Sequence, residues 1–315
     1  TRPGQCYRLL TETSFRSALR EHTLPEITRC DLRDTVLMLK CLGVDDVSAF
    51  EFATPPTRSA LELALEDLYA LGALDSEARL VEPLGLRIAH GPLPVPLMRL
   101  LLLAAESAHA CAEEAASICA MLTVQSPWLP TKNRDRLNSC QQSFAVYEGD
   151  LVTLLNLLRQ FEMYRVEDAE WAKRHLLNAH VLDRALLIRQ QLVMYLRKYD
   201  LPIKSCGLDV EPLQRLACAS LFLNAARRVP NGMYRLCRPI NEELAPHVRF
   251  SLHPYSVLSS IQEHAAADFL VYVEAKCSGE FPELLQNTRV KAEWLPELAP
   301  HYFQELRAGS AASDM

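Results

Sequence analysis

The sequence predicts a mainly α-helical protein with a β-barrel near its C-terminal end. Leu and Ala dominate the composition, and only 10 of the 315 residues are Gly, which favours helices. Through the first two thirds of the chain, apolar residues recur with the period of amphipathic helices. The last third instead contains short runs of β-branched and aromatic residues between turn residues, which are typical of strands.

The first segment contains two amphipathic helices and a hairpin. "DLRDTVLMLKCLG" (31–43) has an apolar face and is expected to end at Gly43. "TPPTRSALELALEDLYALGAL" (54–74) begins with a Pro pair and is expected to end at Gly72. "LDSEARLVEPLG" (74–85) predicts a short β-hairpin. Helix, helix and small β-wing is the order of a winged-helix domain. A winged-helix protein that binds DNA is a distant alternative, because the candidate recognition helix, 59–71, is acidic and does not suit the major groove.

The second segment predicts a helical bundle. Four stretches carry a helical apolar stripe, and the stretch between the second and third, "QSPWLPTKNRDRLNS" (125–139), is expected to be a loop. The four stretches are "VPLMRLLLLAAESA", "AEEAASICAMLTV", "GDLVTLLNLLRQFEMY" and "AEWAKRHLLNAHVLDRALLIRQQLVMYLRKY". Asp150, at the start of the third, is expected to cap the amides that follow it.

The third segment predicts several short strands. "MYRLCRP" (233–239), "VRFSLHPYSVLSS" (248–260) and "FLVYVEAKC" (269–277) are rich in β-branched and aromatic residues. Short strands that follow a helix suggest a small barrel of the OB type. The small, polar tail at 305–315 is expected to be frayed.

Composition narrows the classes of protein. The net charge is −6, so binding to nucleic acid would depend on local basic patches. The longest apolar run, around 97–105, is shorter than the ~18–20 residues of a membrane span, and no secretory signal is visible. The ten Cys form no CxxC pair and no metal-spaced cluster. We therefore expect an intracellular protein without a membrane partner, whose thiols are reduced and mostly buried.

Motifs for nucleotide binding and catalysis are absent from the sequence. There is no GxxxxGK[ST] phosphate loop, no DExH or DExD tetrapeptide and no GxGxxG. HExxH and GxSxG are also missing. We expect no catalytic residue, no bound cofactor and no metal in this chain.

In this order, the parts resemble the C-terminal half of the DEAH-box ATP-dependent RNA helicases. The resemblance covers about residues 1–304 and rests on seven stretches in the same order as in the family. They are "TRPGQCYRLLTETSF" (1–15), "LPEITRCDLRDTVLMLKCLGVDDVSAFEFATPP" (24–56), "ALEDLYALGALDSEARLVEPLG" (64–85), "EGDLVTLLNLL" (148–158), "LLNAHVLDRALLIRQQL" (176–192), "LHPYSVL" (252–258) and "EWLPELAPHYF" (293–303).

The resemblance implies a domain order. Residues 1–23 would be the tail of a second RecA-like domain, with a strand at 6–10 whose partners lie in a domain this chain lacks. A winged-helix domain (24–92), a helical ratchet domain (93–205) and an OB-fold domain (206–304) would follow, and then the disordered tail (305–315). The first residues would then lie directly after the ATP-sensing arginine motif of the family, and the sequence would begin within a longer protein.

The resemblance also implies a function. The segment would form one wall of a single-stranded RNA channel, contact RecA-like domains of the same parent chain, and dock activator proteins such as G-patch proteins. ATP and Mg would bind in the missing RecA-like domains, so the segment alone would be inactive as an ATPase. A nuclear or cytoplasmic location and a pathway such as mRNA splicing fit the family.

Four polar residues on the helix predicted near 176–192 are candidate RNA contacts. The family points this helix at RNA, so the side chains of Asn178, His180, Arg184 and Arg189 would meet phosphates or bases. The alternative is a solvated helix face with i,i+4 ion pairs. The family commonly has an aromatic residue and an Arg where this chain has Ala179 and His180.

The OB segment supplies the other candidate RNA contacts. Arg227, Tyr234 and Arg235 combine basic groups with a ring, as single strands require. The alternative is a Tyr packed in the barrel with solvated Arg around it. His253 and Ser256 lie in "LHPYSVL", which is similar to the His-Pro-Ser-Ser loop of the family, and could donate to RNA; a structural His is the alternative.

A non-catalytic scaffold in a ribonucleoprotein is the second functional hypothesis. After "VYVEAK" the family usually has a Thr-x-Lys, but this chain has Cys277 followed by Ser and Gly. Arg289 or Lys291 could replace the missing cation. The acidic net charge and the missing Lys favour a degenerate adaptor that uses its surfaces for protein contacts.

Overall fold

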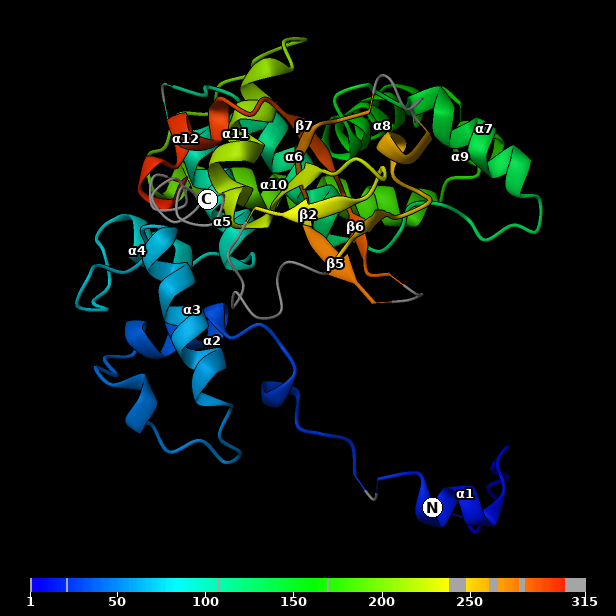
Figure 1. Cartoon of the computed structure of the whole chain (residues 1–315). Coiled ribbons are helices and arrows are strands. Elements are labelled where there is room, and N and C mark those ends of the chain that lie inside the picture. The colour runs from blue at the N-terminus through cyan, green and yellow to red at the C-terminus, as the bar shows by residue number, and fades with distance from the viewer. Residues whose placement is uncertain are drawn as a thin grey trace.

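A computed structural model of the chain describes residues 2–20, 22–106, 108–168, 170–237, 248–260, 266–277 and 281–303 (Figure 1). These residues form a mainly helical protein, as the composition predicts, with two small sheets in the last third of the chain. The helices are α1 (Glu12–Ser17), α2 (Arg33–Cys41), α3 (Arg58–Ala70), α4 (Leu84–Ala89), α5 (Val95–Ala104), α6 (Ala112–Thr123), α7 (Arg134–Phe144), α8 (Asp150–Tyr164), α9 (Trp171–Arg174), α10 (Ala179–Lys198), α11 (Glu211–Leu221) and α12 (Trp294–Leu298). None of the helices in the described ranges is both long and apolar enough to span a membrane.

The helices α2, α3 and α4 form a lobe at one side of the larger body (Figure 1). Gly43 (φ +85°) and Gly72 (φ +72°) follow the ends of α2 and α3, as predicted, because a residue without Cβ adopts this left-handed conformation easily. The predicted wing is reduced to a single bridge between Leu74 and Leu80. The carboxylate of Asp75 accepts the backbone N–H of Arg79 at 2.8 Å, so this turn is closed by a side chain.

The bundle of α5 to α10 differs from its prediction in two places. Helix α7 begins inside the stretch predicted as a loop and covers its last part, 134–139, and the side chain of Asn133 caps the helix by accepting the N–H of Arg136 at 3.0 Å. The last predicted helix is broken into α9 and α10 at Leu176, whose φ is +55°. Leu177 then pairs with Trp128 in an isolated bridge, so a tertiary contact interrupts the helical pattern.

Within the described ranges, seven short strands form two sheets. One sheet has the order β2 (Tyr234–Leu236), β1 (Ala225–Arg228), β4 (Phe269–Val271), β7 (Thr288–Val290), and all its pairs are antiparallel. The other has the order β3 (Ser251–Leu252), β6 (Glu283–Leu285), β5 (Glu274–Lys276). A bridge between Tyr234 and Phe250 connects them. The residues described here do not form a closed barrel, so the predicted barrel is not confirmed.

The ends of the chain differ from the rest. Residues 2–20 are exposed throughout and include α1, which lies away from the body (Figure 1). The stretch 6–10, predicted as a strand, forms none within the described chain. The tail predicted at 305–315 lies outside the described residues.

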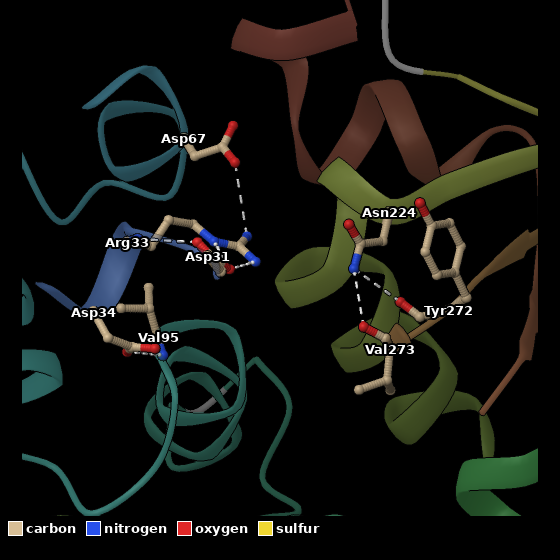
Figure 2. A network of polar contacts seen from close by, with 8 residues as sticks. All are labelled: Asp31, Arg33, Asp34, Asp67, Val95, Asn224, Tyr272 and Val273. Atoms are coloured by element: carbon tan, nitrogen blue, oxygen red, sulfur yellow. Dashed lines mark hydrogen bonds and ion pairs between the residues drawn. The ribbon is translucent and has the colours of Figure 1, made fainter. Parts of the chain in front are cut away.

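Charged side chains connect the α2–α4 lobe to the bundle. Asp34 accepts the N–H of Val95 at the start of α5, at 2.9 Å (Figure 2). Burial raises the pKa of Asp34, and the hydrogen bond from Val95 opposes that shift. Beside it, Arg33 lies between two carboxylates: its Nε donates to Asp31 at 2.7 Å, and its Nη1 lies 3.8 Å from Asp67.

Arg99 of α5 lies where three parts of the molecule meet. Its Nε donates to the carbonyl of Leu71, after α3, at 2.9 Å, and its Nη1 donates to the carbonyl of Ala219 in α11. Burial lowers its pKa to about 10, which leaves the group charged at neutral pH. One side chain therefore joins the lobe, the bundle and the segment that leads into the sheets.

The prediction for the cysteines is only partly right. None of the ten Cys is in a disulfide, and three of them (Cys111, Cys119 and Cys218) are buried. Burial raises the pKa of each of these thiols to about 12. The other seven are half-buried or exposed, so the expectation that most thiols are buried is wrong.

Candidate nucleic-acid interface

The first turns of α10 present two polar side chains to solvent. His180 and Arg184 are exposed, and neither side chain makes a hydrogen bond or ion pair within the described chain. Asn178 precedes the helix and is half-buried; its N–H donates to the carbonyl of Pro127 at 2.8 Å. Of the four candidates on this helix, His180 and Arg184 are therefore the most open to a ligand.

Arg189 is bound by another helix. Its Nη1 donates to Oε2 of Glu162 in α8 at 2.7 Å, and its Nη2 donates to the second carboxylate oxygen. These hydrogen bonds lower the pKa of Glu162. The structure favours an ion pair for Arg189, as in the structural alternative, but the pair joins two helices instead of neighbouring turns.

Arg227 and Arg235 lie directly opposite each other on β1 and β2. Both side chains lie on the same face of the sheet, Arg227 is exposed and Arg235 is half-buried, and the described residues offer neither an acidic partner. Like charges at directly opposed positions repel, so an anion placed between them would be stabilising. This is the arrangement that a phosphate group fits.

Tyr234 lies on the other face of the same sheet. It is only 2% exposed, and its hydroxyl donates to the carbonyl of Ala267 at 2.8 Å. A buried ring cannot stack on a base, so the geometry favours the packed alternative for Tyr234.

The loop after β3 carries a donor beside an exposed ring. Nδ1 of His253 accepts the N–H of Tyr255 at 3.1 Å, so the proton of the neutral imidazole is on Nε2. The ring of Tyr255 is 61% exposed and lies edge-on to His253, with centroids 5.1 Å apart. The Nε2–H and the Tyr255 ring are available to a ligand.

Ser256 belongs instead to a buried junction between α8 and this loop. Its hydroxyl donates to Asp150 at 2.7 Å, and the N–H groups of Val257 and Asn287 donate to the same carboxylate at 2.7 and 2.8 Å. Burial raises the pKa of Asp150, and the three donors oppose the shift. The sequence predicts that Asp150 caps its own helix. In the structure its carboxylate instead accepts hydrogen bonds from two loops of the sheet region.

Gly149 allows this junction to form. Its φ is +123°, and a Cβ on it would lie 2.4 Å from the carbonyl oxygen of Asn287. The N–H of Asp150 donates to that same oxygen at 2.7 Å. A side chain at position 149 would push α8 away from the turn between β6 and β7.

A cavity of about 270 Å³ opens between the helices and the loop after β3. Its walls come from the end of α6 and the residues after it, from α7 and α8, from the loop after β3, and from the turn after β6. Its lining includes the aromatic, imidazole and amide side chains of Gln125, Trp128, Gln141, His253, Tyr255 and Gln286. Sequence reasoning misses the first two because it assigns 125–139 to a connecting loop; the signal is a Trp in a polar, Pro-containing stretch.

The loop after β5 offers no replacement for the lysine of the family. Cys277 is exposed, and residues 278–280 lie outside the described ranges. The guanidinium of Arg289 lies 4.0 Å from the ring centre of Tyr147, and Lys291 lies 3.5 Å from Glu211. Both cations that could compensate are engaged within this chain. Among the described residues, no group of three or more acidic, His or Cys side chains could hold a metal ion.

Two family models match the chain. Residues 95–154 match the family described as helicase associated domain (HA2), ratchet-like. Residues 213–302 match the family described as oligonucleotide/oligosaccharide-binding (OB)-fold.

Relatives match along nearly the whole chain. A probable ATP-dependent RNA helicase DHX35 from Homo sapiens is 37% identical over 307 residues, which are 97% of this chain and 41% of the relative. The pre-mRNA-splicing factor ATP-dependent RNA helicase prp22 from Schizosaccharomyces pombe is 35% identical over 99% of this chain and 26% of its own length. The pre-mRNA-splicing factor ATP-dependent RNA helicase DEAH10 from Arabidopsis thaliana is 31% identical, over 96% of this chain and 42% of its own length. The chain thus spans about two fifths or less of these relatives.

Proposed function

The chain is homologous to the C-terminal region of the DEAH-box RNA helicases, and on that premise we propose that it forms one wall of a single-stranded RNA channel in a parent helicase. The observation that carries the proposal is the pair Arg227 and Arg235, opposed in register without an acidic partner among the described residues. Such a pair is costly unless an anion lies against it. A phosphate of the RNA backbone supplies that anion.

Other open side chains complete the proposed RNA surface. His180 and Arg184 on α10, and His253 in the loop after β3, have donors that no described residue uses. Arg189, Tyr234 and Ser256 are left out because their polar groups are used inside the protein. An RNA contact by the half-buried Asn178 stays a prediction.

The remaining parts of the activity belong to the parent protein. ATP and Mg²⁺ would bind RecA-like domains of the parent chain, and their movement would shift RNA along this wall. Activators of the G-patch type would dock on the lobe. There Met38 of α2 is 53% exposed, and Leu42, which follows α2, is 74% exposed. The names of the relatives further lead us to propose a nuclear role in pre-mRNA splicing.

Salt-dependent binding of labelled single-stranded RNA tests the RNA wall. We expect weak binding by the isolated chain, with affinity that falls as salt rises, because each neutralised phosphate releases counterions. Arg227→Ala should weaken binding and reduce the salt slope by roughly 0.7 for each phosphate that the variant no longer neutralises. Arg58→Ala is the matched control, since Arg58 is exposed on α3 and its ion pair among the described residues is with the neighbouring Glu62.

A scaffold without RNA contacts is the second candidate. The internal engagement of Arg189 and Lys291 favours it, because these cations are not open to a strand. Binding that is absent, or indifferent to salt and to Arg227→Ala, would decide for the scaffold. RNA-dependent ATP hydrolysis by the isolated chain would contradict the assignment of ATP to the rest of the parent.

A further inference from the structure

Aromatic residues from two separate parts of the chain line the cavity between the helices and the loop after β3. Trp128 is half-buried, its ring tilts against that of Phe144 with centroids 6.0 Å apart, and the residue lines the cavity. Tyr255 and His253 contribute from the loop after β3. Aromatic rings beside a small cavity suit a planar ligand.

Gln286 adds to the cavity a polar group that has no partner among the described residues. Oε1 of Gln286 is buried and accepts no hydrogen bond within the described structure. Gln286 also has φ +48°, in the left-handed region that side chains other than Gly and Asn rarely adopt. A buried acceptor on a strained residue is costly, and such strain is characteristic of binding sites.

The negative charge of Asp150 disfavours an anionic group inside the cavity. Asp150 lines the cavity, but its carboxylate already accepts from Ser256, Val257 and Asn287. An anion inside would be repelled by this carboxylate. A neutral planar group meets no such repulsion.

A cation lies on the cavity side of α7. Gln141 lines the cavity, and Arg134 is seven residues earlier, so it lies on the same face of the helix and roughly 10 Å along it. Arg134 is exposed, and the described residues give it no ion-pair partner. Arg136 is exposed as well but lies on the opposite face of α7.

We propose that this cavity binds one unpaired base of a single-stranded RNA, with Tyr255 and Trp128 as stacking surfaces, Gln286 and the Nε2–H of His253 on the edge of the base, and Arg134 on a neighbouring phosphate. The proposal rests on the proposed RNA function and deepens it: the chain binds a base as well as the backbone. Stacking contributes to affinity for any base, whereas Gln286 and His253 select by the donors and acceptors of the base edge.

Two RNA probes of equal length separate base binding from backbone binding. One is oligoadenylate and the other is the corresponding abasic ribose-phosphate oligomer, and the affinity of the full chain is measured for each. We expect Tyr255→Ala to weaken binding of oligoadenylate about tenfold and to leave the abasic oligomer unchanged. Gln286→Gly should act in the same direction although it relieves the positive φ, so misfolding cannot explain its effect.

Variants of α7 test the phosphate contact. Arg134→Ala should weaken both probes, and Arg136→Ala should change neither. If Tyr255→Ala and Gln286→Gly weaken both probes equally, or neither, the cavity does not bind a base. If the unaltered chain binds neither probe, the proposed RNA function itself fails, so the two failures are distinguishable.

Discussion

Single side chains decide which cations of this protein are open to the proposed RNA. Arg227 and Arg189 look alike in sequence, since each lies in a stretch with other polar residues. The structure separates them: Arg227 faces another Arg, whereas Arg189 faces Glu162. A guanidinium that already has a bidentate carboxylate gains little from a phosphate, because the ion pair must first be broken.

Arg189→Ala should therefore affect stability and not RNA affinity. The two side chains are 25% and 44% exposed, so solvent screens the pair and we expect a loss of only about 0.5 kcal/mol at neutral pH. The pKa of Glu162 is lowered in the folded state, so the contribution of the pair is present above the ordinary value of 4.5 and is lost as the pH falls through the lowered pKa. Urea unfolding of both proteins across this range measures it; a difference that persists at the acidic end would contradict the ion pair.

The helices and strands show what local sequence can and cannot predict. The ends of α2 and α3 were predictable because a Gly in the left-handed region needs no distant partner. Helix α7 was missed because its polar surface outweighs two buried residues, Leu137 and Phe144. The break at Leu176 was missed because its cause is a pairing with another segment, at Leu129.

The candidate site follows the same division. Arg227 and Arg235 were identified from composition, but their opposition depends on strand register, which the sequence does not specify for short strands. Ser256 was assigned to RNA because the loop resembles that of the family; the acceptor of its proton, Asp150, is 106 residues away. Contacts between distant segments are the part that sequence reasoning could not supply.

At the scale of elements, the junction of α8 with the β6–β7 turn depends on Gly149. Gly149→Ala would combine a strained φ with a Cβ 2.4 Å from a carbonyl oxygen, and we expect a loss of roughly 3 kcal/mol or more. Gly207→Ala is the matched control, since Gly207 has φ +65° and nothing within 4 Å of its Cβ; it should cost about 1 kcal/mol. Denaturant unfolding gives both values, and equal losses would mean that the junction yields without cost.

At the scale of the whole molecule, one hydrophobic core runs through parts that the sequence divides into domains. The same buried cluster contains Leu37 of the lobe, Leu101 of the bundle, Phe222 after α11 and Val290 of the sheet. Arg99 adds hydrogen bonds from α5 to the end of α3 and to α11. His301, near the end of the described chain, contacts the carbonyl of Ala70 in the lobe at 2.8 Å. These contacts make the three parts a single base for the proposed RNA surface.

A continuous core predicts that the lobe does not unfold by itself. All three Trp lie outside the lobe, so Trp fluorescence reports the bundle and the sheet region, whereas far-UV circular dichroism also includes α2, α3 and α4. We expect the two signals to change together on heating.

In Arg99→Ala the carbonyls of Leu71 and Ala219 lose their donor and a cavity forms, which should cost about 3 kcal/mol and weaken the attachment of the lobe. An early transition in circular dichroism that fluorescence does not follow should then appear in the variant; its presence already in the unaltered chain would show that the lobe is a separate unit.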